Sequence, residues 1–360
     1  MSHPTTPVGT IILGASGYVA GELLRWIAGH PTLDLLGAVS KSHGGAPIAD
    51  SFPHLSLAFP DDRFVSPDDV PALLRRGAGS AGRIAALSAA PHTASAPQIA
   101  ALLEAADAVG IEVPVVDLSA DFRHPDPETF ERIYGVPHPT PDLLPTFRSG
   151  LPEFEAGDTT GIRIGHPGCF ASAVALAAAP LCRTGRVGPE IHVAAITGST
   201  GSGGSPKPTT HHPFRHANLY TYKALSHRHA PEMEDMLQPP GGARPRVRFV
   251  PHSGPFARGI HATAFLRPTS PMSNDALDAL YRDFYAEAPL VQVSDAPRLK
   301  ETVGSAAAVV GARTDGETIV AMSAIDNLGK GAASGGVQWM NRLLGLPDDA
   351  GLTTPPPGWL

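Results

Sequence analysis

The sequence contains few cysteines, little charge and no long apolar run. Cysteine occurs only at positions 169 and 182 of the 360 residues, which excludes a disulfide framework and suits a reducing cytoplasm. Charged residues make up 17%, and the 34 acidic residues outnumber the 27 basic ones, which disfavours a nucleic-acid partner. The most apolar stretch, residues 170–181, is shorter than the roughly 20 residues that span a membrane. The N-terminal segment lacks the basic start of a signal peptide. We therefore expect a cytoplasmic protein without a nucleic-acid or membrane partner.

The order of apolar segments predicts an α/β fold. A length of 360 residues favours about two domains. In the first part, short runs rich in β-branched residues alternate with segments of helical periodicity, a pattern typical of a parallel, doubly wound sheet. The expected strands are residues 8–13, 32–39, 83–88 and 114–118, and the expected helices are residues 17–28 and 97–108.

The second part predicts a mixed, partly antiparallel sheet. Residues 137–152 are rich in proline and polar residues, and we interpret them as a connection between domains. The expected strands beyond it are 191–197, 246–251 and 259–266, followed by a helix at 273–286, a hairpin formed by 306–312 and 318–325, and a last helix at 332–344.

A glycine-rich turn follows the first strand and opens the first helix. Phosphate groups bind where backbone N–H groups and the positive end of a helix are exposed, and glycines allow the close approach. The spacing is GxxGxxA, so an ordinary glycine-rich turn is the alternative interpretation. We take Gly14, Ser16, Gly17 and Tyr18 as candidates for dinucleotide binding, which makes the first domain Rossmann-type.

The end of the second strand predicts the cofactor type. NAD sites usually carry an acidic residue there, which would repel a 2′-phosphate. Here Ser40 and Lys41 offer a hydroxyl and a cation instead. The sequence therefore favours NADP over NAD, with an exposed polar loop as the alternative.

One cysteine is a candidate nucleophile. The segment Gly-His-Pro-Gly-Cys ends at Cys169 and precedes an alanine-rich helix. A helix N-terminus favours the thiolate, and the glycine beside the cysteine allows backbone N–H groups to face an oxyanion. Cys182 lies at the far end of the same helix, where we expect a buried and inert thiol.

Two histidines further along the chain are candidates for proton transfer. His227 and His229 share a face if their segment is extended, and histidine titrates near neutral pH. Surface histidines and a metal site are the alternatives, but the sequence contains neither HExxH nor CxxC, so we expect no metal. Lys207, near a glycine-rich loop at 198–205, is a candidate for contacts with acidic substrate groups.

Several motifs together resemble the N-acetyl-γ-glutamyl-phosphate reductase family across nearly the whole chain. The GASGY motif on its own is shared with aspartate-semialdehyde dehydrogenase. The matching segments are GASGY at 14–18, APH at 90–92, DLSADFR at 117–123, LPE at 151–153, GHPGCFASA at 165–173, HRHAPE at 227–232, FVPH at 249–252, ARGI at 257–260 and IDNLGKGAA at 325–333.

The resemblance implies a fold, a reaction and roles for residues. It implies a Rossmann-type NADP-binding domain at 1–160, a dehydrogenase-like α+β catalytic and dimerisation domain at 161–328, and a C-terminal helix at 329–360 that returns to the first domain. It also implies NADPH-dependent reduction of an acyl phosphate through a thioester, a homo-oligomer that is a dimer or tetramer, and a role in arginine biosynthesis. The implied roles are Cys169 as nucleophile and His227 as acid/base, with His229 close by. We take Asn327 as a further candidate for cofactor binding, and the candidates for substrate contacts are Arg123, His229, Lys207 and Arg258.

The blocking group of the substrate stays open. The family often has Arg or Lys where Gly204 stands, and residues 209–213 are more similar to relatives that act on other N-blocked substrates. One of these takes a substrate carried by an acidic carrier protein in lysine biosynthesis. Aspartate-semialdehyde dehydrogenase is a second enzymatic alternative, and an NADP(H)-binding redox sensor is a non-enzymatic one.

Overall fold

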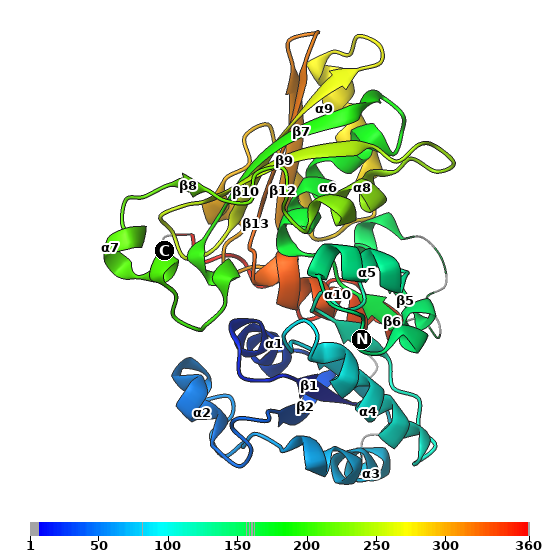
Figure 1. Cartoon of the computed structure of the whole chain (residues 1–360), viewed down its shortest axis with the longest axis vertical. Coiled ribbons are helices and arrows are strands. Elements are labelled where there is room, and N and C mark those ends of the chain that lie inside the picture. The colour runs from blue at the N-terminus through cyan, green and yellow to red at the C-terminus, as the bar shows by residue number, and fades with distance from the viewer. Residues whose placement is uncertain are drawn as a thin grey trace. The chain divides into compact units, whose positions relative to one another are not determined.

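The computed structural model describes residues 7–358, except 81, 156, 158, 160 and 162 and the side chain of residue 80. The chain forms two compact units (Figure 1). Unit 1 comprises the residues up to His166 together with Ala333–Leu352, and unit 2 comprises Pro167–Ala332 together with the residues from Thr353 onward.

Unit 1 is a parallel sheet with helices on both faces. Its strand order is β2-β1-β3-β4-β6-β5, and every strand pair is parallel. All six residues of β1 are buried, as expected for a strand covered on both faces. The strands are β1 (Val8–Leu13), β2 (Leu33–Val39), β3 (Ile84–Ser88), β4 (Val115–Asp117), β5 (Phe147–Ser149) and β6 (Arg163–Gly165).

The helices of unit 1 pack through apolar stripes. Ile11, Val39, Leu73 and Ile99 belong to one buried cluster that joins the sheet to α3 and α4, whereas α1 contacts α10 on the opposite face (Figure 1). The α-helices are α1 (Tyr18–Ala28), α2 (Ile48–Ser51), α3 (Val70–Ser80), α4 (Ser95–Asp107), α5 (Pro127–Tyr134) and α10 (Ser334–Leu343).

Unit 2 is a mixed sheet covered on one face by helices. Its strand order is β11-β12-β13-β10-β7-β9-β8. The strands are β7 (Val187–Thr197), β8 (Tyr220–Thr221), β9 (Arg246–Ser253), β10 (Ile260–Pro268), β11 (Val291–Val293), β12 (Ala308–Thr314) and β13 (Ile319–Ile325). The helices are α6 (Cys169–Cys182), α7 (His212–Arg215), α8 (Ala230–Leu237) and α9 (Asn274–Phe284), and a π-helical turn spans Gly329–Ala333.

The central element of unit 2 is α6, which is apolar all round. Every residue from Phe170 to Cys182 is buried, and the helix contacts β10, β13 and α8. The Ser323 hydroxyl on β13 donates a hydrogen bond of 2.7 Å to the Ala173 carbonyl. This environment fixes the helix whose first residue is Cys169.

The structure confirms the α/β fold class and most expected elements. The expected strands of both sheets and the helices at both ends of the chain are present. The interpretation of residues 137–152 as a plain connection was wrong, because β5 lies within it and pairs with β6. No helix among the described residues is both long and apolar enough to cross a bilayer.

Candidate active site

The nucleophile candidate stands at the start of a buried helix. Cys169 is the first residue of α6 and is partly exposed, and Gly168 is the N-cap with extended backbone angles (φ −65°, ψ 150°). The N-cap residue has no side chain that could cap this end. The first-turn N–H groups therefore favour negative charge at the cysteine, both on a thiolate and on an oxyanion bound beside it.

Gly168 allows a histidine to approach the cysteine. A Cβ atom at position 168 would lie 2.4 Å from both Cε1 and Nε2 of His229, so only glycine leaves room for this ring. The N–H of Gly168 donates a 2.7 Å hydrogen bond to Oε2 of Glu232 on α8. Glu232 is 3% exposed, so the carboxylate fixes the turn before Cys169 from within the fold. It also removes the Gly168 N–H from the donors available to an oxyanion.

His227 lies beside His229 and is held in a neutral state. The two ring centroids are 4.6 Å apart and the rings are nearly perpendicular. Burial, with Arg228 and Lys223 nearby, lowers the pKa of His227 to about 4. Nδ1 of His227 accepts a 3.2 Å hydrogen bond from the N–H of His229, which places the proton of the neutral ring on Nε2.

Aromatic rings surround His227. Its ring centroid is 5.6 Å from Phe170, 5.4 Å from Phe249 and 5.8 Å from Tyr222. Burial, followed by the electrostatic effect of Cys169, raises the pKa of Tyr222. These contacts explain why the imidazole of His227 is desolvated.

Cys182 differs from Cys169 in its position on α6 and in its exposure. It lies at the last residue of α6 and is 5% exposed. Burial raises the pKa of the Cys182 thiol to about 12. The expectation of a buried thiol at this position is confirmed, and the raised pKa disfavours the thiolate.

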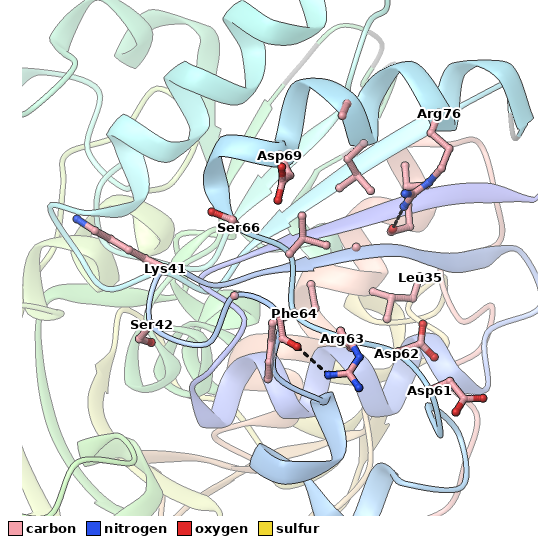
Figure 2. A pocket seen from close by; sticks show the side chains of 18 residues that line it. Leu35, Lys41, Ser42, Asp61, Asp62, Arg63, Phe64, Ser66, Asp69 and Arg76 are labelled. Atoms are coloured by element: carbon pink, nitrogen blue, oxygen red, sulfur yellow. Dashed lines mark hydrogen bonds between the residues drawn. The ribbon is translucent and has the colours of Figure 1, made fainter.

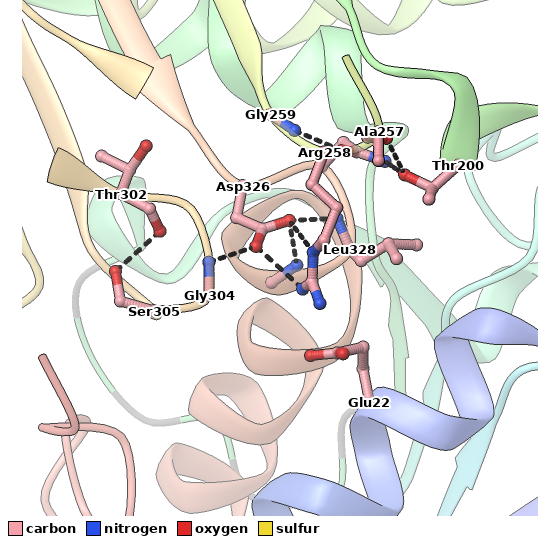
Figure 3. Close-up of polar contacts among 12 residues, drawn as sticks. Glu22, Thr200, Ala257, Arg258, Gly259, Thr302, Gly304, Ser305, Asp326 and Leu328 are labelled. Atoms are coloured by element: carbon pink, nitrogen blue, oxygen red, sulfur yellow. Dashed lines mark hydrogen bonds and ion pairs between the residues drawn. The ribbon is translucent and has the colours of Figure 1, made fainter. Parts of the chain in front are cut away.

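A buried carboxylate organises a polar corner of unit 2 (Figure 3). Asp326 is fully buried, and its oxygens accept hydrogen bonds from the N–H groups of Gly304 (2.6 Å) and Leu328 (2.9 Å). Nη2 of Arg258 lies 2.8 Å from Oδ2 of Asp326. Arg258 is a candidate for substrate contacts, and in unit 2 its guanidinium is oriented by this ion pair.

Asn327 links two further segments to the same corner. Its Oδ1 accepts a 2.7 Å hydrogen bond from the N–H of Gly259, and its Nδ2 donates a 3.0 Å bond to Oγ1 of Thr200. Thr200 in turn donates to the Ala257 carbonyl at 2.7 Å (Figure 3). Within unit 2, the amide of Asn327 therefore fixes the glycine-rich loop after β7 to the turn before β10.

Two other candidates for substrate contacts also hold backbone groups. In unit 1, Arg123 donates from Nε to the His166 carbonyl at 2.9 Å and from Nη2 to the Leu118 carbonyl at 3.1 Å. In unit 2, the exposed Lys207 donates from Nζ to the Ser202 carbonyl at 2.9 Å. Both side chains are thus oriented by the loops that carry them.

The glycine turn of unit 1 has the geometry of an anion site. Gly14 has a φ of +67°, and a Cβ atom there would lie 2.4 Å from Cα of Ala90, so glycine is required. Gly17 is the N-cap of α1, whose start has neither a side-chain cap nor an acidic residue among the described residues. A Cβ atom at position 17 would meet nothing within 4 Å. Beside it, Ser16 is exposed and Tyr18 is 45% exposed. Open space and uncapped N–H groups at one helix end fit the phosphates of a dinucleotide.

A pocket of about 970 Å³ adjoins the end of β2 (Figure 2). Lys41 and Ser42 lie at one end of it, whereas Asp61 and Asp62 lie at the other, and Asp69 lies beside Ser66 (Figure 2). Lys41 is thus separated from Asp61 and Asp62. Ser40, the other residue singled out on this loop, is 3% exposed, and its hydroxyl lies 3.5 Å from that of Ser42.

Sequence reasoning did not single out several residues that shape these sites. Glu232 reaches Gly168 across 64 positions, and Gly331 packs against Cys169 from the π-helical turn. Asp326 orders three separate segments. Glu232, Gly331 and Asp326 all lie inside motifs that resemble the family. That resemblance is the sequence signal that could have indicated them.

Comparisons with known proteins cover nearly the whole chain and indicate semialdehyde dehydrogenases and related reductases. The family model described as the NAD binding domain of semialdehyde dehydrogenase matches residues 10–147, and the model of its dimerisation domain matches residues 169–327. N-acetyl-gamma-glutamyl-phosphate reductase of Rhodopirellula baltica is 36% identical over 349 residues, covering 95% of this chain and 97% of the relative. The enzyme of the same name from Methanopyrus kandleri is 37% identical over 351 residues, covering 96% and 97%. The fold is similar to that of aspartate semialdehyde dehydrogenase II from Vibrio cholerae, with a TM-score of 0.66 at 15% identity, covering 94% of this chain and 99% of the other.

Proposed function

Because the chain belongs to the N-acetyl-gamma-glutamyl-phosphate reductase family, we propose that it reduces N-acetyl-γ-glutamyl phosphate to the semialdehyde through a thioester on Cys169. The observation that carries this proposal is the position of Cys169 at the start of α6 with His229 packed on the preceding glycine. A thiolate, donors for an oxyanion and a proton acceptor are then present in one unit.

In the first half-reaction the thiolate of Cys169 attacks the acyl carbonyl. The N–H groups of the first turn of α6 stabilise the oxyanion, the bond to the phosphate oxygen breaks, and a thioester forms. When bound, NADPH supplies the hydride that reduces the acyl group. Cleavage of the carbon–sulfur bond then releases the aldehyde and restores the thiolate. Phosphate departs before the reduction, and the acyl group stays attached to Cys169 until it is an aldehyde.

Proton transfer is assigned to the histidine pair. The sequence analysis gave this role to His227, with His229 close by. The packing of His229 against Gly168 supports His229 as the group that exchanges a proton with the reacting atoms. His227, whose pKa is about 4, stays neutral at physiological pH and accepts the N–H of His229. We propose that His227 orients the segment that carries His229.

The glycine turn and the β2 loop are proposed to hold NADP(H). Gly14, Ser16, Gly17 and Tyr18 would surround the pyrophosphate, since α1 begins there without a side-chain cap. Ser40 and Lys41 would face the 2′-phosphate. The separation of Lys41 from Asp61 and Asp62 in the adjoining pocket supports NADP over NAD.

Substrate contacts are assigned to Arg123, Lys207 and Arg258, which offer cations to a phosphate or a carboxylate. Each is already oriented by bonds within its own unit. Asn327 would act at the cofactor. We also place the reaction in the cytoplasm, where a reactive thiol stays reduced.

A second copy of the chain is proposed to cover the open face of the unit 2 sheet. The helices α6, α8 and α9 lie on one side of that sheet (Figure 1). On its other side Phe265 is 45% exposed and stands opposite His192 and Val320 on the neighbouring strands. The matching family model is a dimerisation domain. Phe265→Asp is expected to shift the mass measured by light scattering toward the monomer, and an unchanged mass would contradict this face.

The activity is tested by aldehyde oxidation with NADP⁺ and phosphate. The substrates to compare are the semialdehydes of N-acetylglutamate, of N-succinylglutamate, of carrier-linked glutamate or aminoadipate, and of aspartate. We expect the N-acetyl substrate to have the highest kcat/KM. A preference for a carrier-linked or aspartate substrate would reassign the substrate, whereas cofactor binding without any turnover would favour a redox sensor.

A further inference from the structure

Two buried carboxylates in unit 1 have no role in the proposed chemistry. Asp117 and Asp121 lie at and just after the end of β4, and both are fully buried. Burying a carboxylate is costly unless it is well bonded. The partners of these two groups therefore indicate what they stabilise.

Asp121 binds a turn that precedes it by more than 20 positions. Its Oδ1 accepts a 2.6 Å hydrogen bond from the N–H of Thr93, and its Oδ2 accepts a 2.9 Å bond from the N–H of Ala96. These donors lie on either side of the start of α4, where the N-cap residue Ala94 has no side-chain acceptor. Asp121 thus caps α4 from a distant loop.

The turn held by Asp121 has an unfavourable backbone conformation. Thr93 has a φ of +68°, a region that β-branched residues rarely adopt. Among the described residues of unit 1 it is the only non-glycine residue with positive φ. A conformation of this kind persists only where the surroundings impose it, and the bond to Asp121 is such a constraint.

The same turn forms one wall of the glycine turn. The N–H of Ala89 donates a 2.9 Å hydrogen bond to the Leu13 carbonyl. Cα and N of Ala90 lie so close to Gly14 that a Cβ atom there would be 2.4 Å and 2.5 Å away. The position of residues 90–93 therefore sets the space beside the turn that we assign to the pyrophosphate.

Asp117 fixes the same turn from a second side. Its Oδ1 accepts a 2.6 Å hydrogen bond from the Ser95 hydroxyl, and its Oδ2 accepts a 2.7 Å bond from the Ser119 hydroxyl. The Ser119 oxygen accepts the N–H of Asp121 at 3.0 Å. The two carboxylates thus belong to one buried network that ends at the start of α4.

We propose that Asp121 is a positioning residue of the cofactor site, which holds the turn of residues 90–93 against the glycine turn so that a dinucleotide can bind. The inference rests on the proposed function, because the ligand of the glycine turn is taken from it. Asp121 acts through the turn and contacts no reacting atom.

The test is the substitution Asp121→Asn. The amide keeps the size of the carboxylate but turns an NH₂ group toward one of the two backbone donors. We expect the Kd for NADPH, measured by fluorescence titration, to rise about tenfold or more. The KM for NADPH rises with it, while kcat at saturating NADPH and the alkylation rate of Cys169 without cofactor stay near those of the wild type.

Asp126→Asn is the matched control. Asp126 caps α5 in the same unit by accepting the N–H of Thr129 at 2.7 Å, so the substitution makes the same change from carboxylate to amide at a helix cap elsewhere. We expect its Kd for NADPH to stay within about twofold of the wild type. An equal loss of affinity in both variants would mean general destabilisation and would overturn the inference.

Two further measurements complete the test. Ser95→Ala weakens the turn from the side of Asp117 and is expected to raise the Kd by a smaller factor, and it serves as the test if Asp121→Asn does not fold. An unchanged Kd in a folded Asp121→Asn protein, or in Ser95→Ala in its place, would overturn the inference alone. A wild-type protein that binds neither NADPH nor NADH would contradict the proposed function and this inference together.

Discussion

Gly331 lies so close to Cys169 that a Cβ atom at position 331 would stand 2.8 Å from the Cβ of the cysteine. The glycine belongs to a π-helical turn directly after β13. Because Gly331 has no side chain, the first residue of α6 can lie this close to the turn. The distance is too short for any residue with a side chain unless the nucleophile shifts.

Gly331→Ala is expected to lower kcat by about 100-fold, since a displacement of the order of 1 Å at a reacting group has that effect. The Kd for NADPH is expected to stay unchanged. Gly188→Ala on β7 is the control, because its Cβ would meet only the Arg267 carbonyl at 3.9 Å. Steady-state kinetics of both variants provide the measurement, and a Gly331→Ala enzyme with wild-type kcat would show that the packing does not place Cys169.

The two histidines are expected to differ in their pH behaviour. The pKa of His227 is lowered to about 4, so this group does not titrate between pH 5 and 7. His229→Asn should reduce kcat by roughly 100-fold to 10,000-fold. His227→Asn should cost less, because the asparagine oxygen can still accept the N–H of His229.

The pH profile of kcat/KM separates these roles. Any acidic limb between pH 5 and 7 should persist in His227→Asn. Loss of that limb in His227→Asn, with its retention in His229→Asn, would return the proton-transfer role to His227.

Lys41 is expected to determine the choice of cofactor. Lys41→Ala should lower the ratio of kcat/KM for NADPH to that for NADH by about 10-fold to 100-fold, because one charge-assisted contact to the 2′-phosphate is lost. Arg76→Ala serves as the control, since Arg76 lines the same pocket but donates to the Leu36 carbonyl at 3.3 Å. A wild-type enzyme that uses both cofactors equally well would contradict the NADP assignment.

Asp117 is expected to make stability depend on pH in an unusual direction. Burial raises the pKa of this carboxyl from 3.8 to about 6, so the folded state retains a proton that the unfolded state releases. Between about pH 4 and pH 6 the free energy of unfolding therefore falls as pH rises, by roughly 3 kcal/mol from this group.

Asp117→Asn removes this proton linkage. Urea unfolding at pH 4, 5, 6 and 7 should show that the wild-type free energy of unfolding declines with pH relative to that of the variant. Parallel profiles for the two proteins would mean that Asp117 keeps an ordinary pKa in the fold.

Local patterns predicted much of the fold. The strands β1, β2 and β3 are short and mostly apolar, and their expected bounds lie within one residue of the observed ones. By contrast, α3 was not predicted, because glycines at 77 and 79 interrupt its helical pattern. The three-residue strands β5 and β6 are too short to show a period.

The site was predicted only where its chemistry is local in the sequence. The placement of Cys169 at a helix start follows from the turn residues around it, and the structure has α6 beginning there. The bond from Gly168 to Glu232 and the contact of Gly331 with Cys169 join residues far apart in the chain. Such contacts depend on how α6 packs against α8 and β13, which no local pattern specifies.

The thioester on Cys169 is the central claim, and it can be observed directly. The protein is mixed with N-acetyl-γ-glutamyl phosphate in the absence of NADPH, and the products are analysed by intact and peptide mass spectrometry. We predict release of one phosphate per protein chain and one N-acetylglutamyl group on the peptide that contains Cys169, with neither in Cys169→Ser. Turnover retained by Cys169→Ser, or acylation at any other residue, would contradict the account.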